Sequence, residues 1–331
     1  MKHLLKNHLW ICAATALLMT AVRPANAAET PPAGTREGSI EHGGLTRTYR
    51  VHVPSGYDGK KAVPLVLGFH GGGGNAQGAE RNLGFNPLAD KHGFIAVYPQ
   101  GIDSHWNDGR VATRFEKVAK VDDVGFIRAL IGQLQKEFKI DARRIYSAGL
   151  SNGGFISHRL GWELSDLLAA IGPAAGTLST RFEKEFAPKY PVHVIDIHGT
   201  KDGMVPYEGG MVSGQGGLCF GAQKMVAMWA LANGCATPPK SETLPKISKD
   251  KTVVRRDTYA AGAKGAEVVF YTVEGLGHVW PHRSAAGEDA KAGSGTQEFD
   301  AAELVWDFFS KHPKTGGPAA TNSSGPPASG E

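Results

Sequence analysis

One serine motif constrains the fold of this chain more than any other feature of its sequence. Residues 149–153 read Gly-Leu-Ser-Asn-Gly, after a strand-like run at 144–148 and before a helix-like segment that begins at Gly154. A G-x-S-x-G between a buried strand and a helix is typical of a sharp turn that lifts the serine hydroxyl above the sheet. The alternative is a serine in an ordinary turn, since a glycine-rich chain forms this pattern by chance. The flanking residues favour the first interpretation and predict Ser151 as a nucleophile.

Strand-like runs alternate with helix-like segments along the rest of the chain. Continuous apolar runs predict buried strands, and apolar residues at helical spacing predict the helices between them. This alternation is typical of an α/β domain with a mostly parallel sheet and helices on both faces. The first strand is different, because period-two alternation after a glycine turn predicts an antiparallel hairpin. The predicted strands are 46–54, 63–69, 94–98, 144–148, 168–171, 192–197 and 268–273, and the predicted helices are 122–139, 154 onward, 221–233 and 299–312.

The first 27 residues have the pattern of a secretory leader. Lys2 and Lys6 precede an uncharged stretch over residues 9–22, and the small residues of 25–27 follow as a cleavage site. This order is typical of a signal peptide, and the uncharged stretch is shorter than the ~20 residues of a transmembrane helix. We therefore expect cleavage after Ala27 and a secreted or periplasmic mature protein.

The net charge of the chain depends strongly on this leader. The full chain has a formal charge of +4, which would favour an anionic partner. The leader contains Lys2, Lys6 and Arg23 and no acidic residue, so its removal lowers the charge from +4 to +1. The composition then favours neither nucleic acid nor a membrane surface as a partner, and nothing in the sequence indicates an oligomeric state.

The last segment, residues 313–331, consists largely of Pro, Gly and Ser, which supply 11 of its 19 residues. Such a composition is typical of a disordered tail. The whole chain is 41% hydrophobic and 21% charged, so a core of ordinary size can form. Residues 28–312 are therefore predicted to form one domain, which is within the usual size of α/β folds.

Two cysteines, Cys219 and Cys235, remain after the leader and would meet an oxidising compartment. The predicted helix 221–233 lies between them. The twelve helical steps from residue 221 to residue 233 span ~18 Å, whereas the Cα atoms of a disulfide lie within ~7 Å of each other. We expect no disulfide between these cysteines unless the helix is broken or short.

A serine nucleophile needs a base and an acid, and after a strand–turn–helix serine motif the chain order is serine, acid, histidine. His278 and His282 follow the last predicted strand; His278 is the predicted base and His282 a predicted surface residue. Asp202 follows the strand 192–197 and is the predicted acid, with a turn cap as its alternative role. Asp196 lies inside that strand, where we expect it to point into the packing.

A glycine run after an early strand is the expected place for an oxyanion hole, which needs two backbone N–H groups aimed at the developing charge. The amide of Asn152 would supply one, and the run 70–74 the other, through Gly72 or else Gly73. The same run with Ala76 also matches a dinucleotide-binding fingerprint, but four glycines form that match by chance. The chain has no G-x-x-x-x-G-K-[ST] phosphate loop either, so no nucleotide is expected. No other cofactor and no metal are expected.

Two further pairs of residues have both a structural and a functional interpretation. Asp122 and Asp123 open the helix 122–139, where capping is favoured over a metal or acid site. Trp106 and Trp280 are candidates for the walls of an acyl-binding pocket, and an aromatic wall would suit a phenolic acid. The alternative is that both tryptophans belong to the core.

The sequence from about Arg47 to Phe309 resembles the extracellular feruloyl esterases and polyhydroxybutyrate (PHB) depolymerases of the α/β-hydrolase superfamily. The resemblance implies an α/β-hydrolase fold and a catalytic triad of Ser151, Asp202 and His278, the residues that chain order also selects. The motifs that carry it are His70-Gly71-Gly72, Trp106-Asn107-Asp108-Gly109, 121–126, 149–154, 198–202, Asn233-Gly234-Cys235 and 277–281.

Two departures from the family pattern affect what the resemblance implies. Relatives often have a cysteine shortly after a Thr-Tyr pair that bonds the one in Asn-Gly-Cys, whereas here Tyr259 is followed by Ala260 and Cys235 lacks that partner. Depolymerases that attack solid polyester usually have an added surface-binding domain, whereas this chain ends in a short tail, which favours soluble esters or oligomers.

The resemblance implies a serine carboxylic-ester hydrolase that acts through an acyl-enzyme on a small or oligomeric ester. Feruloyl esters of plant cell-wall xylan or related soluble esters are the expected substrates, and hydroxybutyrate oligomers are the alternative. Two other classes stay open: a serine peptidase with the same triad, and a non-catalytic binding protein of the same fold. The second would usually have lost a triad residue, and none is missing here.

Overall fold

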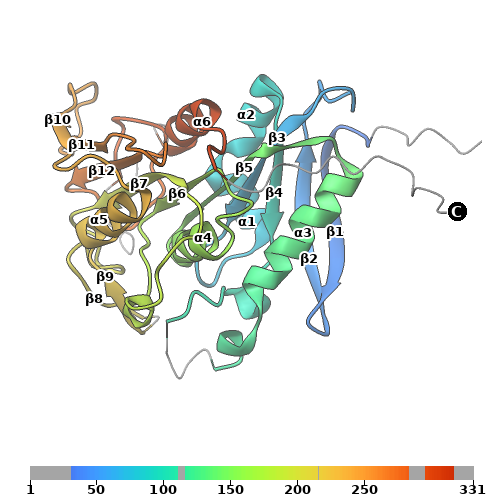
Figure 1. Ribbon diagram of the computed structural model, residues 1–331, viewed down its shortest axis with the longest axis horizontal. Helices are drawn as coiled ribbons and strands as arrows, with labels where there is room; N and C mark the ends of the chain where they lie inside the picture. Colours follow the sequence, from blue (N-terminus) through green and yellow to red (C-terminus); the bar gives the residue numbers. More distant parts are fainter. Residues whose placement is uncertain (1–30, 111–115, 215, 283–294, 317–331) are drawn as a thin grey trace, which may run out of the picture. The chain divides into compact units, whose positions relative to one another are not determined.

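A mixed sheet forms the centre of the protein in a computed structural model, which describes residues 31–110, 116–214, 216–282 and 295–316 (Figure 1). The strands in these ranges are β1 (Gly34–His42), β2 (Leu45–Val53), β3 (Val63–Phe69), β4 (Ile95–Pro99), β5 (Ile140–Leu150), β6 (Ala170–Ala174), β7 (His193–Gly199), β8 (Gly209–Met211), β9 (Leu218–Phe220), β10 (Lys240–Thr243), β11 (Val253–Tyr259) and β12 (Val268–Glu274). The main sheet has the order β1-β2-β4-β3-β5-β6-β7-β12-β11-β10, and β8 and β9 form a separate pair. The strands from β4 to β12 in this order are parallel, and both edges are antiparallel.

Helices cover both faces of this sheet, which confirms the predicted α/β architecture (Figure 1). The α-helices are α1 (Ala76–Leu83), α2 (Phe85–His92), α3 (Asp123–Glu137), α4 (Asn152–Glu163), α5 (Ala222–Asn233) and α6 (Ala301–Lys311), with short 3₁₀ turns at η1 (Ile102–Ser104), η3 (Val118–Lys120) and η4 (Thr180–Phe182). The predicted hairpin is confirmed as β1–β2. The sequence did not predict α1, α2 or the strands from β8 to β11, and α4 begins two residues before its predicted start.

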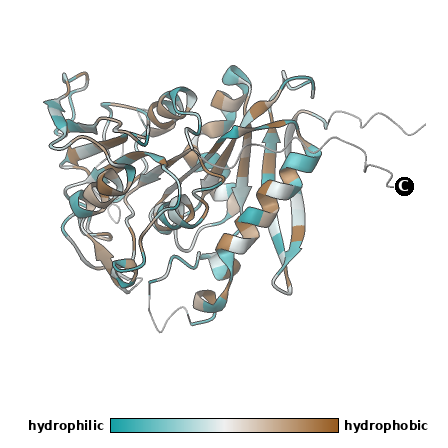
Figure 2. Cartoon of the chain, in the orientation of Figure 1, coloured by the Kyte–Doolittle hydropathy of each residue, from teal (hydrophilic) through white to brown (hydrophobic). Residues whose placement is uncertain are grey.

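The sheet has a hydrophobic core on each face because its central strands have apolar side chains on both faces. Leu65 and Leu67 of β3 belong to the same hydrophobic cluster as apolar residues of α3, α4 and α5, whereas Val66 between them belongs to the cluster that includes α1, α2 and α6. Side chains of a strand alternate between the faces, so a continuous apolar run is needed where helices cover both. Figure 2 shows brown residues recurring along the strands and along α3.

The folded part of the chain continues past residue 312, where the sequence predicted a disordered tail to begin. Lys314 is buried, and its backbone N–H donates to the carbonyl of Arg143 at 2.8 Å. Its ammonium donates to the carbonyls of Ser165 and Leu168, and burial lowers its pKa to about 8. The prediction was therefore wrong for the first residues of that segment. The rest of the predicted tail and the predicted leader lie outside the described residues.

Both cysteines outside the leader are free thiols, with the unbroken helix α5 between them. Cys219 is buried on β9, and the thiol of Cys235 donates to the carbonyl of Ala266 at 3.3 Å. In the ranges that the structure describes, no helix is both long and apolar enough to cross a membrane.

Candidate active site

Ser151 occupies the sharp turn between β5 and α4. Its backbone has φ 58° and ψ −124°, a conformation that costs a residue with a Cβ about 1–3 kcal/mol. The turn is possible only because residue 153 is a glycine and has no side chain. A Cβ at Gly153 would lie 2.3 Å from the carbonyl oxygen of Phe69. The start of α4 thus packs directly on the end of β3. Strain of this kind at a strand-to-helix turn is typical of an exposed nucleophile.

Asp202 and His278 form a hydrogen-bonded pair. His278 Nδ1 lies 2.8 Å from Asp202 Oδ2, and the other carboxylate oxygen accepts the backbone N–H groups of Met204 and Val205, both at 2.8 Å. Burial raises the pKa of Asp202, but the hydrogen bond and charge of His278, the His198 ring and the N–H of Val205 together outweigh it, so the pKa lies below its ordinary value. Asp202 is therefore an ionised carboxylate that orients the imidazole through Nδ1.

The three predicted catalytic residues lie at one edge of the sheet. Ser151, Asp202 and His278 follow the carboxyl ends of β5, β7 and β12, which run parallel within the same sheet. Ser151 N donates to Ala174 O at the end of β6, and Lys201 N donates to Leu276 O, which joins the loops that carry Asp202 and His278; both bonds are 2.9 Å long. The carboxyl edge of a parallel sheet is where α/β proteins bind their ligands.

The glycine loop after β3 is held by the side chain that opens it. His70 accepts the N–H of Gly101 at Nε2 (3.0 Å), so its other nitrogen donates to the carbonyl of Gly71 (2.8 Å). Burial lowers the pKa of His70 to about 4, which keeps the ring neutral at physiological pH. The indole N–H of Trp106 donates to the carbonyl of His70 at 3.0 Å. These bonds hold the loop in one conformation beside the serine.

Two of the loop amides are already used inside the protein. Gly73 N donates to Ser104 O at 2.9 Å, and Gly74 N donates to Gly71 O at 3.0 Å. Gly73, the alternative donor, is therefore less suited than Gly72 to bind an oxyanion. Asn152 is the first residue of α4, where backbone N–H groups carry the positive end of the helix dipole.

The side chain of Asn152 has a second role, which the sequence did not predict. Its Oδ1 accepts the N–H of Trp106 at 2.8 Å, and its Nδ2 donates to Asp108 Oδ2 at 2.6 Å. Asp108 in turn forms a buried ion pair with Arg110, with 2.6 Å between the nearest atoms. The Trp-Asn-Asp-Gly motif is thus a loop fastened to the residue after the serine. The motif itself was the only sequence signal for this contact.

Asp122 and Asp123 have different roles. Asp122 caps α3 by accepting the N–H of Gly125 at 2.8 Å, as predicted. Asp123 is not a simple cap: its oxygens accept the guanidinium of Arg47 and the N–H of Asn107, both at 2.6 Å. Burial raises the pKa of Asp123, and the Arg47 charge opposes that rise. Asp123 therefore joins β2, α3 and the loop next to the serine through a buried ion pair.

We expect Asp123→Asn to lower the free energy of unfolding by about 3–5 kcal/mol, because it leaves Arg47 buried without its counter-charge. The neighbouring Asp122→Asn is the matched control and should cost less than about 1 kcal/mol, because asparagine caps helices as well as aspartate does. Urea unfolding of the two variants measures the difference. Equal losses would contradict the assigned roles.

Both candidate pocket tryptophans are core residues. Trp106 is 2% exposed, and its ring packs on Phe69 and His70. Trp280 is 5% exposed and packs edge-on against Phe85, on the α1–α2–α6 side of the sheet. The structure therefore favours the core alternative for both. Trp106 still affects the site, because its indole N–H donates to the carbonyl of His70 at the start of the glycine loop.

His282 and Asp196, the alternatives to the predicted base and acid, both have structural contacts. His282 is half-buried at the surface and not free there: it contacts the carbonyl of Asn82, and its Nδ1 lies 3.3 Å from Asp300, which caps α6. The hydrogen bond to Asp300 raises the pKa of His282. Asp196 points into the packing as predicted, where it is fully buried 3.2 Å from the Nε2 of His158.

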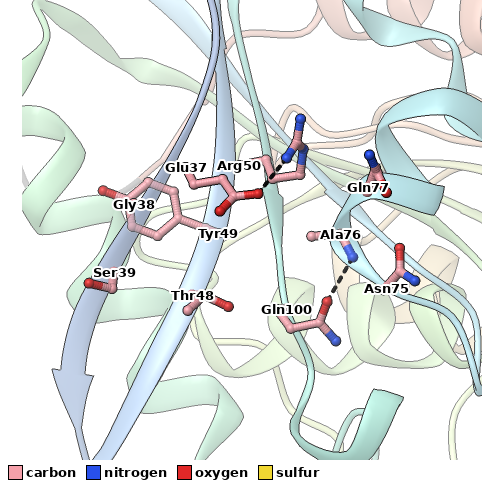
Figure 3. A pocket seen from close by; sticks show the side chains of 10 residues that line it. All are labelled: Glu37, Gly38, Ser39, Thr48, Tyr49, Arg50, Asn75, Ala76, Gln77 and Gln100. Carbon is pink, nitrogen blue, oxygen red and sulfur yellow. Dashed lines mark hydrogen bonds and ion pairs between the residues drawn. The ribbon is translucent and has the colours of Figure 1, made fainter.

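A separate polar pocket of about 450 Å³ lies between the β1–β2 hairpin and the start of α1 (Figure 3). It contains none of the predicted site residues. Gln100 connects it to the glycine loop, because its Oε1 accepts the N–H of Ala76 at 2.8 Å and its Nε2 lies 3.5 Å from His70 Nε2. The lining residues are Glu37, Gly38, Ser39, Thr48, Tyr49, Arg50, Asn75, Ala76, Gln77 and Gln100.

Comparison with known proteins identifies esterases as relatives. The family model described as "Esterase PHB depolymerase" matches residues 47–185. The putative esterase NocK of Nocardia uniformis subsp. tsuyamanensis is 29% identical over 276 residues, which cover 80% of each chain. Feruloyl esterase B of Piromyces equi is 31% identical over 237 residues, or 69% of this chain. That alignment spans 42% of the fungal protein, less than half of its length.

Solved esterase structures have the same fold. The acetyl xylan esterase from Aspergillus awamori aligns with a TM-score of 0.56 and 14% identity, over 83% of this chain and 99% of that one. A thermostable esterase aligns with a TM-score of 0.55 and 16% identity, over 85% of this chain and 63% of that one. Residues 47–185 thus match the PHB depolymerase esterase family, and the chain as a whole is similar to esterases in sequence and in fold.

Proposed function

We propose that the protein is a serine carboxylic-ester hydrolase that works through an acyl-enzyme. The observation that carries the proposal is the strained elbow at Ser151, on the same sheet edge as the Asp202–His278 hydrogen bond of 2.8 Å. A nucleophile, a base and a residue that orients the base are the three parts that this chemistry needs.

The reaction follows from the tautomer of His278. Its Nδ1–H is held by Asp202, which leaves Nε2 to accept the hydroxyl proton as Ser151 attacks the ester carbonyl. The amides of Gly72 and Asn152 stabilise the oxyanion, each by about 2.7–4 kcal/mol. His278 then protonates the leaving alcohol, and the Ser151 ester is hydrolysed by water through the same steps.

Esters of plant cell-wall polysaccharides are the substrates that we propose, with feruloyl groups first. The relatives named as feruloyl esterases support this choice, as does the fungal relative named as an acetylxylan esterase and xylanase. Hydroxybutyrate oligomers are the second candidate, because the matching family model is named for PHB depolymerase. The buried positions of Trp106 and Trp280 give no support for an aromatic acyl pocket.

One substrate panel distinguishes these candidates. Methyl ferulate, p-nitrophenyl acetate, acetylated xylan and hydroxybutyrate oligomers are assayed under identical conditions, with peptide anilides for the peptidase alternative. Methyl ferulate should give the highest kcat/KM. Higher turnover of the oligomers would favour the second candidate, and turnover of anilides without esters would contradict the proposal.

We also propose that the protein acts outside the cytoplasm, because residues 1–27 have the pattern of a signal peptide. Mass spectrometry of the protein recovered from the periplasm or medium should show a mature chain that begins at Ala28. Full-length protein retained in the cytoplasm would contradict this.

A further inference from the structure

Asp202 has a second histidine neighbour, His198, at the end of β7. His198 is fully buried, and its Nε2 lies 3.0 Å from the carbonyl oxygen of Val205 and 3.5 Å from Asp202 Oδ2. A carbonyl oxygen can only accept a hydrogen bond, so Nε2 carries the proton. That N–H therefore lies close to the carboxylate oxygen that holds His278.

The other ring nitrogen of His198 shows that packing alone does not explain a histidine here. Nδ1 is buried, and no hydrogen-bond partner for it occurs among the residues that the structure describes. A buried polar atom without a partner is unfavourable, and an apolar side chain of similar volume would avoid it. The useful part of the ring at this position is thus the Nε2–H.

N–H groups lie around both oxygens of the Asp202 carboxylate. Oδ1 accepts the backbone N–H groups of Met204 and Val205 at 2.8 Å each. Oδ2 accepts the Nδ1–H of His278 at 2.8 Å, and the Nε2 of His198 lies 3.5 Å from the same oxygen. These three hydrogen bonds restrict rotation of the carboxylate and stabilise its charge. His198 also holds Val205, which supplies one of the three, through the bond to its carbonyl.

Few other titratable groups face this cluster. The ring of Tyr207 lies 5.9 Å from that of His198 between centroids, and its hydroxyl bonds Thr272 at 2.9 Å. Burial raises the pKa of the Cys219 thiol, and the charge of Asp202 adds to that rise. Arg110 acts on the same thiol in the opposite direction. Of these groups, only His278 forms a side-chain hydrogen bond with Asp202, and only His198 places a further N–H group within 3.5 Å of the carboxylate.

We propose that His198 is a positioning residue that holds the Asp202 carboxylate in place and reduces its basicity, thereby setting the proton affinity of His278. The inference rests on the proposed ester hydrolysis. Without the Nε2–H, the carboxylate would attract the His278 proton more strongly. The protonated, inactive form of the base would then persist to higher pH.

His198→Leu removes the donor, whereas His198→Gln retains an N–H near the position of Nε2. With p-nitrophenyl acetate, we expect the leucine variant to lose about tenfold in kcat with a smaller change in KM. The acid limb of its kcat/KM profile should move up by about half a pH unit. The glutamine variant should restore most of kcat and the parental limb.

His193→Leu is the matched control, because His193 is a buried histidine on the same strand. Like His198, it has one ring nitrogen without a partner among the described residues, in this case Nε2. The acid limb of the kcat/KM profile of this control variant should coincide with that of the parent enzyme. A folded His198→Leu enzyme with parental kcat and limb would overturn the proposal, as would a glutamine variant as impaired as the leucine one. If the leucine variant does not fold, His198→Asn replaces it, since its amide reaches only the Nδ1 position. Equal profiles for the asparagine and glutamine variants would also overturn it.

A proton NMR measurement separates this inference from the proposed function. The downfield resonance of the His278 Nδ1–H should shift in the leucine variant and not in the His193 control, whether or not an ester is turned over. A parent protein that hydrolyses no ester would contradict the proposed function alone. An unshifted resonance in the leucine variant would contradict the positioning role alone.

Discussion

Ser151→Ala is expected to retain the fold and to lose at least ~10³-fold in kcat/KM for ester substrates. Alanine has a Cβ like serine, so the backbone strain at φ 58° is the same before and after the change. What disappears is the hydroxyl that forms the acyl-enzyme. A residual rate above that of water should remain, because the amides of Gly72 and Asn152 can still stabilise an oxyanion.

The matched control for this variant is Ser147→Ala. Ser147 is a buried serine on β5, four residues before the elbow, and its hydroxyl donates to Ser157 Oγ at 2.9 Å. Its loss should lower stability by about 0.5–1.5 kcal/mol and leave kcat/KM within about threefold. Circular dichroism and p-nitrophenyl acetate kinetics measure both effects. Unchanged ester turnover in Ser151→Ala would rule out the serine mechanism.

Asp202→Asn should lower kcat by about 10⁴-fold, the order seen when the acid of a Ser-His-Asp triad is replaced by its amide. The carboxylate accepts the Nδ1–H of His278 at 2.8 Å. An amide nitrogen there would donate instead, so the proton of the ring would move to Nε2 and block the base. The pKa of Asp202 lies below its ordinary value, so the carboxylate of the parent enzyme stays ionised throughout the neutral range.

Asp196→Asn is the control for this second prediction. Asp196 is also fully buried and lies on β7, six residues before Asp202, but the side chain that contacts it is His158. We expect its activity to stay within about tenfold of the parent, since no catalytic group contacts it. Measurements of kcat on p-nitrophenyl acetate compare the two variants. Similar losses would mean that Asp202 is not the acid that orients His278.

The sequence predicted those parts of the protein whose physics is local. The continuous apolar run of β3 and the period-two pattern of β2 each correspond to an observed strand. The helix α3 was predicted because its apolar spacing and its Asp122 cap are contained in one short segment. The elbow was visible because strand, glycine turn and helix are adjacent in the chain.

The sequence did not predict the elements that depend on distant contacts. The helix α1 has only eight residues and a strongly polar composition, and the edge strand β10 has four residues that are mostly exposed. Short elements with weak patterns are stabilised by what they pack against. Likewise, nothing in the local pattern around Lys314 shows that its ammonium would be buried against two carbonyls more than 140 positions away.

The sequence by itself determined the α/β architecture, the elbow serine and the chain order that selected Asp202 and His278. Only the tertiary structure showed that Asp123 pairs with Arg47, that the side chain of Asn152 holds the loop next to the serine, and that Trp106 and Trp280 are core residues. The physical reason is range. Period and turn chemistry act between neighbours in the chain, whereas burial and hydrogen-bond partners depend on residues that meet only after the sheet has formed.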